Sequence, residues 1–163
     1  MQVTQRLLAT IVEAAPFAIL LVDGSSGAIA FANRSAAQLF GYPVATLVGM
    51  NVDALVPQAA HARHAGHRAA FARDPAERRM ASGRALSARR ADGSEVAVEV
   101  ALKPIDDAPS SYVLAVVVDI SARRQLESEV REAHEDLERR IGERTAELVR
   151  ITADKERLLR TWK

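Results

Sequence analysis

The sequence predicts an α+β domain that is followed by one long helix. Short apolar runs alternate with turn residues over about the first 120 positions, which is typical of a sheet built from short strands. Residues 95–103 place valine or leucine at every second position, the period of a strand with one buried face. From Ser121 to Lys163 the chain has no proline and is rich in helix-forming residues. Because two strands precede several short helices and three strands follow them, we expect an antiparallel sheet with helices on one face.

The composition narrows the classes of function. The 163 residues, 48% of them hydrophobic, are enough for one domain core. The 22 basic and 21 acidic residues nearly cancel, so no nucleic-acid partner is expected. Since the chain has no cysteine, disulfides, zinc–thiolate sites and thiolate nucleophiles are excluded, and a cytoplasmic location is expected. No catalytic acid–base pair, nucleophile motif or phosphate-binding loop is recognisable, so we expect that the chain is not an enzyme.

The chain is predicted to begin with an amphipathic helix and a hairpin. Residues 1–15 form the expected N-terminal cap helix, which has one apolar stripe and ends at Pro16. Because Glu13 and Pro16 interrupt this apolar segment, neither a signal peptide nor a membrane span is expected. Strands are predicted at 18–23 and 28–32, joined by a turn of glycine and serine.

Several helices and three strands are expected to follow. Asn33 can cap a helix that closes near Gly41, and short helical turns are predicted at 44–47 and 52–55. A longer helix at 57–73 carries three of the four histidines. After a basic connection, strands are predicted at 84–90, 95–103 and 111–118, with a loop at 104–110.

The order and spacing of these segments resemble a PAS domain. The pieces that carry the resemblance are ILLVDGSSGAIAFANRSAAQLFGY, LVGMNVDALVP, RRADGSEVAVEVALKPI and VVVDIS, and together they cover roughly residues 12–121. The resemblance implies a five-stranded antiparallel sheet whose helical face can enclose a small molecule. In this family Asp-Ile-Ser or Asp-Ile-Thr joins the domain to a signalling helix, and Asp119, Ile120 and Ser121 match that junction.

The resemblance also implies that the chain consists of three segments with different roles. A cap helix (1–15) and a sensor domain (16–121) would precede a coiled-coil signalling helix (122–163). The segment LERRIGERTAEL resembles the linker helices between PAS domains and the catalytic parts of sensor histidine kinases. We therefore expect a module of a two-component system that relays a signal to an output domain or partner, such as a histidine kinase. A dimerisation scaffold without ligand and a haem-based gas sensor are the alternatives.

The sequence leaves the ligand open. His64 resembles in its placement the proximal histidine of the oxygen-sensing PAS domains of nitrogen-fixation kinases, and Arg84 could meet a propionate, so haem is one candidate. An unidentified metabolite, or no ligand, is the other possibility. The residues expected to line a pocket are Asn33, Leu55, His64, His67, Phe71 and Arg84.

Flavin and metal are not expected. Val52 stands where light-sensing relatives that bind flavin carry a cysteine, which excludes cysteinyl photochemistry. His61, His64 and His67 follow each other at intervals of three residues, which spreads their rings around a helix instead of gathering them on one metal ion.

The C-terminal helix carries the apolar pattern of a coiled coil. The first four seam positions step by four, three and four residues; an insertion of four residues between Leu137 and Ile141, beside Gly142, then shifts the register. A coiled coil with such a shift in register is marginally stable and can adopt two arrangements of similar energy. We expect the change between these arrangements to be the basis of signalling. A helix that folds back on its own domain is the alternative to a parallel homodimer. The expected dimer interface is Leu126, Val130, Ala133, Leu137, Ile141, Leu148, Ile151 and Leu158.

Overall fold

A computed structural model describes residues 4–73, 78–80, 86–107 and 110–162. The chain divides into two compact units, Met1–Ser121 and Ala122–Lys163. No helix among the described residues is both long enough and apolar enough to cross a membrane.

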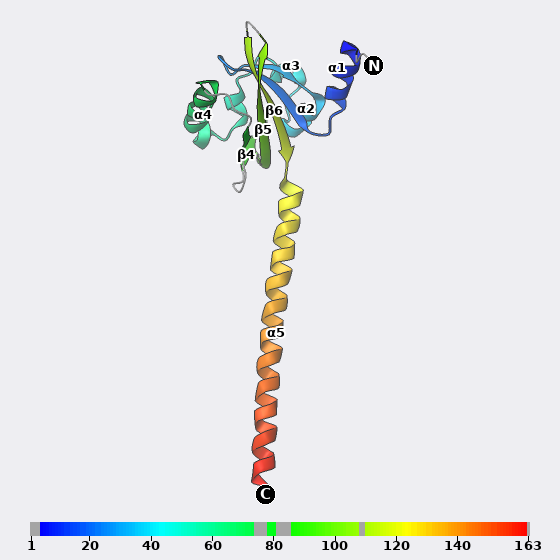
Figure 1. Ribbon diagram of the computed structural model, residues 1–163, viewed down its shortest axis with the longest axis vertical. Helices are drawn as coiled ribbons and strands as arrows, with labels where there is room; N and C mark the ends of the chain where they lie inside the picture. The colour runs from blue at the N-terminus through cyan, green and yellow to red at the C-terminus, as the bar shows by residue number, and fades with distance from the viewer. Residues whose placement is uncertain (1–3, 74–77, 81–85, 108–109, 163) are drawn as a thin grey trace. The chain divides into compact units, whose positions relative to one another are not determined.

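The first unit is built around one antiparallel sheet of six strands (Figure 1). These strands are β1 (Ala18–Asp23), β2 (Ile29–Ala32), β3 (Arg78–Met80), β4 (Leu86–Arg89), β5 (Glu95–Asp107) and β6 (Ser110–Asp119). They run in the order β2-β1-β6-β5, and β3 and β4 both pair with β5 at its other edge. Because β3 and β4 share one position beside β5, the sheet has five strand positions. The predicted α+β fold with a five-stranded antiparallel sheet is confirmed.

Two strand predictions were wrong. The basic connection contains β3, whose three residues Arg-Arg-Met show no alternation and pair with residues 100–102 of β5. In addition, β5 continues through the expected loop at 104–110 as far as Asp107, with Pro104 opposite Val113 of β6. Proline has no backbone N–H, so it is tolerated where a strand pairs on one side only. Among the described residues, the pairing of β3 ends at Leu102, before Pro104.

The helices of the first unit are short. They are α1 (Gln5–Ala14), α2 (Arg34–Phe40), α3 (Val44–Leu47), the 3-10 helices η1 (Val52–Leu55) and η2 (Gln58–Ala60), and α4 (His61–Arg73). Alternate residues of β1 face the core, where Leu20 packs with Ala36 and Phe40 of α2. The predicted end of α2 is also observed, because Gly41 follows it with a left-handed φ of 74°.

Asn33 joins the N-terminal segment to the sheet and to α2. Its side chain is completely buried. Its Oδ1 atom accepts hydrogen bonds from the backbone N–H of Ala36 (3.0 Å), as predicted for a helix cap, and of Ile19 (2.9 Å). Its Nδ2 group donates to the carbonyl oxygens of Val12 and Phe17, both at 3.0 Å. One amide therefore fixes the end of α1, the start of β1 and the first turn of α2.

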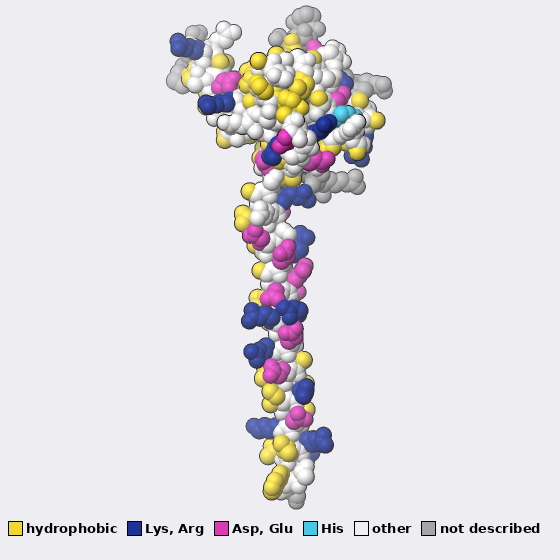
Figure 2. All heavy atoms as spheres, turned by 180° about the vertical axis from the view of Figure 1, so that it is seen from behind, with side chains coloured by type: hydrophobic (Ala, Val, Ile, Leu, Met, Phe, Trp, Pro, Cys, Tyr) yellow, Lys and Arg dark blue, Asp and Glu magenta, His cyan; other side chains and the backbone are white. Residues whose placement is uncertain are grey.

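The second unit is a single helix. Helix α5 (Ser121–Thr161) has 41 residues, which corresponds to a length of about 60 Å. Figure 2 shows hydrophobic side chains recurring along α5 among charged ones. None of its described residues is buried within the chain, and Leu137 is 53% exposed.

Candidate functional site

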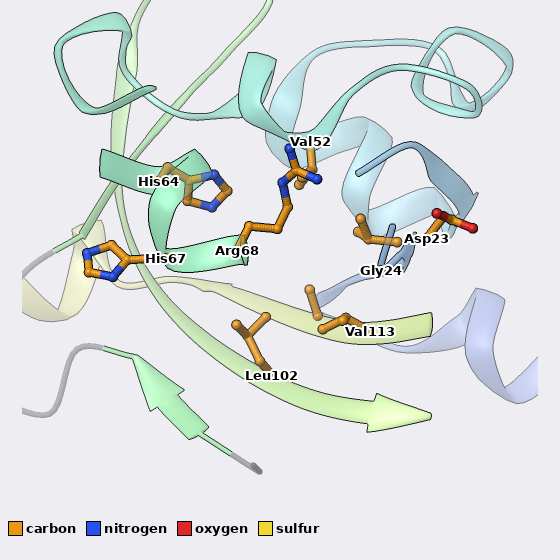
Figure 3. Close-up of a pocket in the computed structure, with 10 residues that line it drawn as sticks. Asp23, Gly24, Val52, His64, His67, Arg68, Leu102 and Val113 are labelled. Carbon is orange, nitrogen blue, oxygen red and sulfur yellow. The ribbon is translucent and has the colours of Figure 1, made fainter. Parts of the chain in front are cut away.

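A pocket lies between α4 and the sheet of the first unit (Figure 3). Its volume is about 70 Å³, and most of its lining is apolar. Helix α4 contributes three basic side chains to the lining, and η1 contributes a valine. Strand β1 contributes its last two residues, and β5 and β6 contribute apolar side chains on the face of the sheet that lines the pocket. The lining residues are Val22, Asp23, Gly24, Val52, His64, His67, Arg68, Leu102, Val113 and Ala115.

Asp53 holds two of the α4 side chains in place. The Nδ1 atom of His64 lies 2.6 Å from Asp53 Oδ1, and an Nη2–H of Arg68 donates to Asp53 Oδ2 at 3.1 Å. His64 and Arg68 can share this partner because residues four apart lie on the same face of a helix. Neither Asp53 nor Arg68 was predicted from the sequence; the spacing of His64 and Arg68 was a visible signal, whereas the approach of η1 to α4 was not.

The two aspartates near the pocket have lowered pKa values. Burial raises the pKa of Asp53, but the hydrogen bond from His64 and the charge of Arg68 outweigh it and hold that pKa below its ordinary value. Asp23 lies in the turn after β1, where the hydroxyl and N–H groups of Ser25 and Ser26 donate to its carboxylate and hold its pKa far below the ordinary value. Both groups are therefore carboxylates near neutral pH.

The predicted pocket residues are only partly brought together. His64 and His67 line the pocket. Leu55 is buried in the hydrophobic core, and Asn33 is occupied by its four backbone partners; neither belongs to the lining. The side chain of Phe71 and the whole of Arg84 lie outside the described residues.

The pocket as it stands in this structure is smaller than a haem group. A volume of about 70 Å³ is well below the roughly 300 Å³ at which pockets for drug-sized ligands begin. Arg68 lies beside His64 and is paired with Asp53, so a macrocycle would have to displace that ion pair. Val52 lines the pocket and has no thiol to offer to a flavin. Among the described residues, no group of three or more histidine or acidic side chains could hold a metal ion.

The junction residues are tied to the sheet and to α2. The Asp119 carboxylate accepts a hydrogen bond from the N–H of Ser121 at 2.8 Å, and the N–H of the buried Ile120 donates to Ala97 of β5 at 3.0 Å. Helix α5 begins at Ser121 itself, and the Asp119 carboxylate takes an N–H of its first turn.

Arg90 is a junction residue that was not predicted from the sequence. Its Nη2 atom lies 3.5 Å from Asp119 Oδ2, and its Nε–H donates to the carbonyl oxygen of Leu39 in α2 at 3.0 Å. Arg90 therefore contacts both the end of β6 and the last turn of α2. Its place after β4 carried no sequence signal, because its partners lie about 30 and 50 residues away.

Comparisons with known proteins agree with this architecture. Residues 6–120 match the family described as PAS fold. The sensor protein FixL of Bradyrhizobium diazoefficiens is 23% identical over 130 residues, which are 80% of this chain and 26% of FixL. The chain thus spans about a quarter of the length of FixL.

Solved structures share the fold. A PAS domain from a two-component sensor histidine kinase has a TM-score of 0.59 at 15% identity, over 70% of this chain and 94% of that one. An RNA-binding light-oxygen-voltage receptor has a TM-score of 0.65 at 16% identity, over 80% of this chain and 37% of that one.

Proposed function

Because the chain belongs to the PAS fold family, we propose that it is a sensory module that dimerises through α5 and relays a signal to an output domain or partner. The relation to FixL and to a kinase PAS domain supports a histidine kinase as that output. The cytoplasmic location expected from the cysteine-free sequence is part of this proposal.

The relay proposal rests on strand β6, which runs without a break from the pocket to the junction. Val113 and Ala115 line the pocket, and the same strand ends at Asp119. A ligand that shifts β6 would therefore change the geometry between Asp119 and Arg90. Because Asp119 also accepts from the N–H of Ser121, this change acts on the first residue of α5.

The exposed seam of α5 supports the dimer. A single helix cannot bury an apolar stripe by itself, and a parallel coiled coil with a second copy would cover it. Leu126 is 62% exposed and Leu148 is 64% exposed within the chain. Intrahelical ion pairs, such as Arg139 with Glu143 at 2.8 Å, lie between the seam positions and support the helix itself.

A matched pair of alanine substitutions tests the dimer. Ala133 is a seam position, whereas Ala146 falls on the outer face of the same predicted heptad pattern. We expect that Ala133→Glu weakens association, since it places a charge in the interface, and that Ala146→Glu leaves it unchanged. Analytical ultracentrifugation over a range of concentrations measures the difference. A monomeric parent chain, or equal effects of the two variants, would contradict the coiled-coil dimer.

A fusion tests the relay. The full chain is joined through α5 to the catalytic core of a histidine kinase, and autophosphorylation is measured. We expect Arg90→Gln and Asp119→Asn to change the activity in the same direction, and the double variant to change it no further, because the two side chains act as a pair. Arg89→Gln, an exposed neighbour on β4, is the control. If neither pair variant alters the activity while the dimer persists, the chain is a dimerisation scaffold instead.

A further inference from the structure

The leucines of α5 recur at a fixed interval. Four of the five leucines in this helix follow each other at steps of eleven residues. Each of the four is more than half exposed within the chain, so their side chains are available to a partner. They are Leu126 (62%), Leu137 (53%), Leu148 (64%) and Leu159 (61%).

The rest of the seam follows the same interval. From Leu126 the seam advances by four, three and four residues to Leu137, and the same three steps lead on to Leu148 and then to Leu159. The extra step of four residues after Leu137 is therefore not a single interruption of a heptad pattern, because it occurs again after Leu148. The seam positions between the leucines are Val130, Ala133, Ile141, Arg144, Thr152 and Lys155.

A repeat of eleven residues has a defined geometry on a helix. Eleven residues in three turns correspond to about 3.67 residues per turn, slightly more than the 3.6 of a straight α-helix, whereas a heptad repeat needs about 3.5. On such a helix the four leucines form one row, and Leu158 lies about 100° away from that row. Two helices with this repeat pack almost straight, with a slight right-handed twist instead of the left-handed twist of a heptad coiled coil.

A second copy of α5 is the partner that fits this surface. In a parallel pair without a shift, each layer meets the identical layer of the other copy, so leucine faces leucine four times and Ile141 faces Ile141. An antiparallel pair that keeps leucine opposite leucine would place Ile141 against Arg144 and Val130 against Lys155, which buries charge against apolar side chains. In the parallel pair Arg144 can keep its charge in water, because its side chain is 81% exposed and donates to Glu147 at 3.2 Å.

We propose that two parallel copies of α5 associate through this eleven-residue repeat, with Leu159 in the interface and Leu158 outside it. The inference rests on the dimer proposed above and changes its distal half, where a heptad pattern would place Leu158 at the seam. Because the two leucines are neighbours in the sequence, they form a matched pair for an experiment.

Disulfide formation between single introduced cysteines shows which residues face their counterparts. The full chain has no cysteine, so each variant carries one thiol. Two identical positions can form a disulfide only where their Cα atoms come within about 7 Å of each other, so residues in the interface cross-link faster than those outside it. We expect Leu159→Cys to cross-link at least about tenfold faster than Leu158→Cys under the same mild oxidant.

Two control variants separate the repeat from the dimer itself. Leu137→Cys lies in the interface in both patterns and should cross-link rapidly, whereas Ala146→Cys lies on the outer face in both and should not. If Leu137→Cys cross-links rapidly but Leu158→Cys matches or exceeds Leu159→Cys, the eleven-residue repeat is overturned and the dimer stands. If Leu137→Cys cross-links no faster than Ala146→Cys, the dimer is overturned and the repeat with it.

Discussion

Replacing Asn33 by alanine removes a side chain that joins α1, β1 and α2. The substitution leaves the backbone N–H groups of Ile19 and Ala36 without their acceptor. It also leaves the carbonyl oxygens of Val12 and Phe17 without their donor. Because the Asn33 side chain is completely buried, water cannot easily take its place. The variant should therefore loosen the end of α1 as well as destabilise the domain.

The expected loss is large for a single residue. Removing a helix cap costs about 1 kcal/mol. Each of the three other buried hydrogen bonds contributes about 1 kcal/mol as well. We therefore expect the free energy of unfolding to fall by roughly 4 kcal/mol, out of the about 5–15 kcal/mol that is usual for a domain.

Urea unfolding of the full chain at fixed protein concentration measures this loss. Tyr42 and Tyr112, the two tyrosines of the chain, report on the domain and not on α5. Asn51→Ala is the matched control: Asn51 is exposed, caps η1 and donates to Ser26, so its removal should cost about 1 kcal/mol or less. If Asn33→Ala costs no more than Asn51→Ala, the reasoning from the buried amide is refuted.

Three further predictions concern single residues. The pKa of Asp53 is lower in the folded chain, so its carboxylate stabilises the fold above the ordinary aspartate pKa of about 3.9 and this contribution is lost as the pH falls through the lowered value. Asp53→Asn should therefore make urea midpoints less sensitive to pH between about 5 and 3; an unchanged pH profile would contradict the pairing. Gly27→Ala should destabilise the domain by more than about 1 kcal/mol, and by more than Gly49→Ala, because both have positive φ but only Gly27 lies against Arg68. Gly142→Ala should stabilise α5 by up to about 1 kcal/mol in thermal melts followed by circular dichroism, since no atom outside its own helix lies within 4 Å of the added carbon; lower stability would argue for a close contact there.

Local signals were enough to predict most of the fold. The apolar run at 18–23 predicted β1, the alternation at 95–103 predicted the buried face of β5, and Asn33 and Gly41 mark the ends of α2. Pro104 misled the prediction because proline weakens a strand only where its missing N–H is needed by a neighbour. Three residues without alternation, as in β3, give no periodic signal; only pairing with β5 makes them a strand.

The functional site is formed by contacts between segments that are far apart in the sequence. Fewer of its residues could therefore be predicted. His64 and His67 could be placed on one face of a helix from their spacing alone. Arg68 and Asp53 meet because η1 packs beside α4, and Arg90 meets Asp119 across the end of the sheet. Such pairs need the tertiary arrangement, since an arginine on a polar surface looks the same in the sequence whether or not it has a distant partner.

Helix α5 runs without interruption from Ser121 to Thr161. The number of residues in the helix therefore determines the direction in which anything attached to its end faces. Each added residue rotates everything beyond it by about 100°, so an insertion of seven residues restores the original direction to within about 20°, whereas an insertion of two reverses it. If an output domain reads the orientation of this helix, insertions of different length will alternate between preserved and inverted responses. The number of inserted residues would then matter more than their identity.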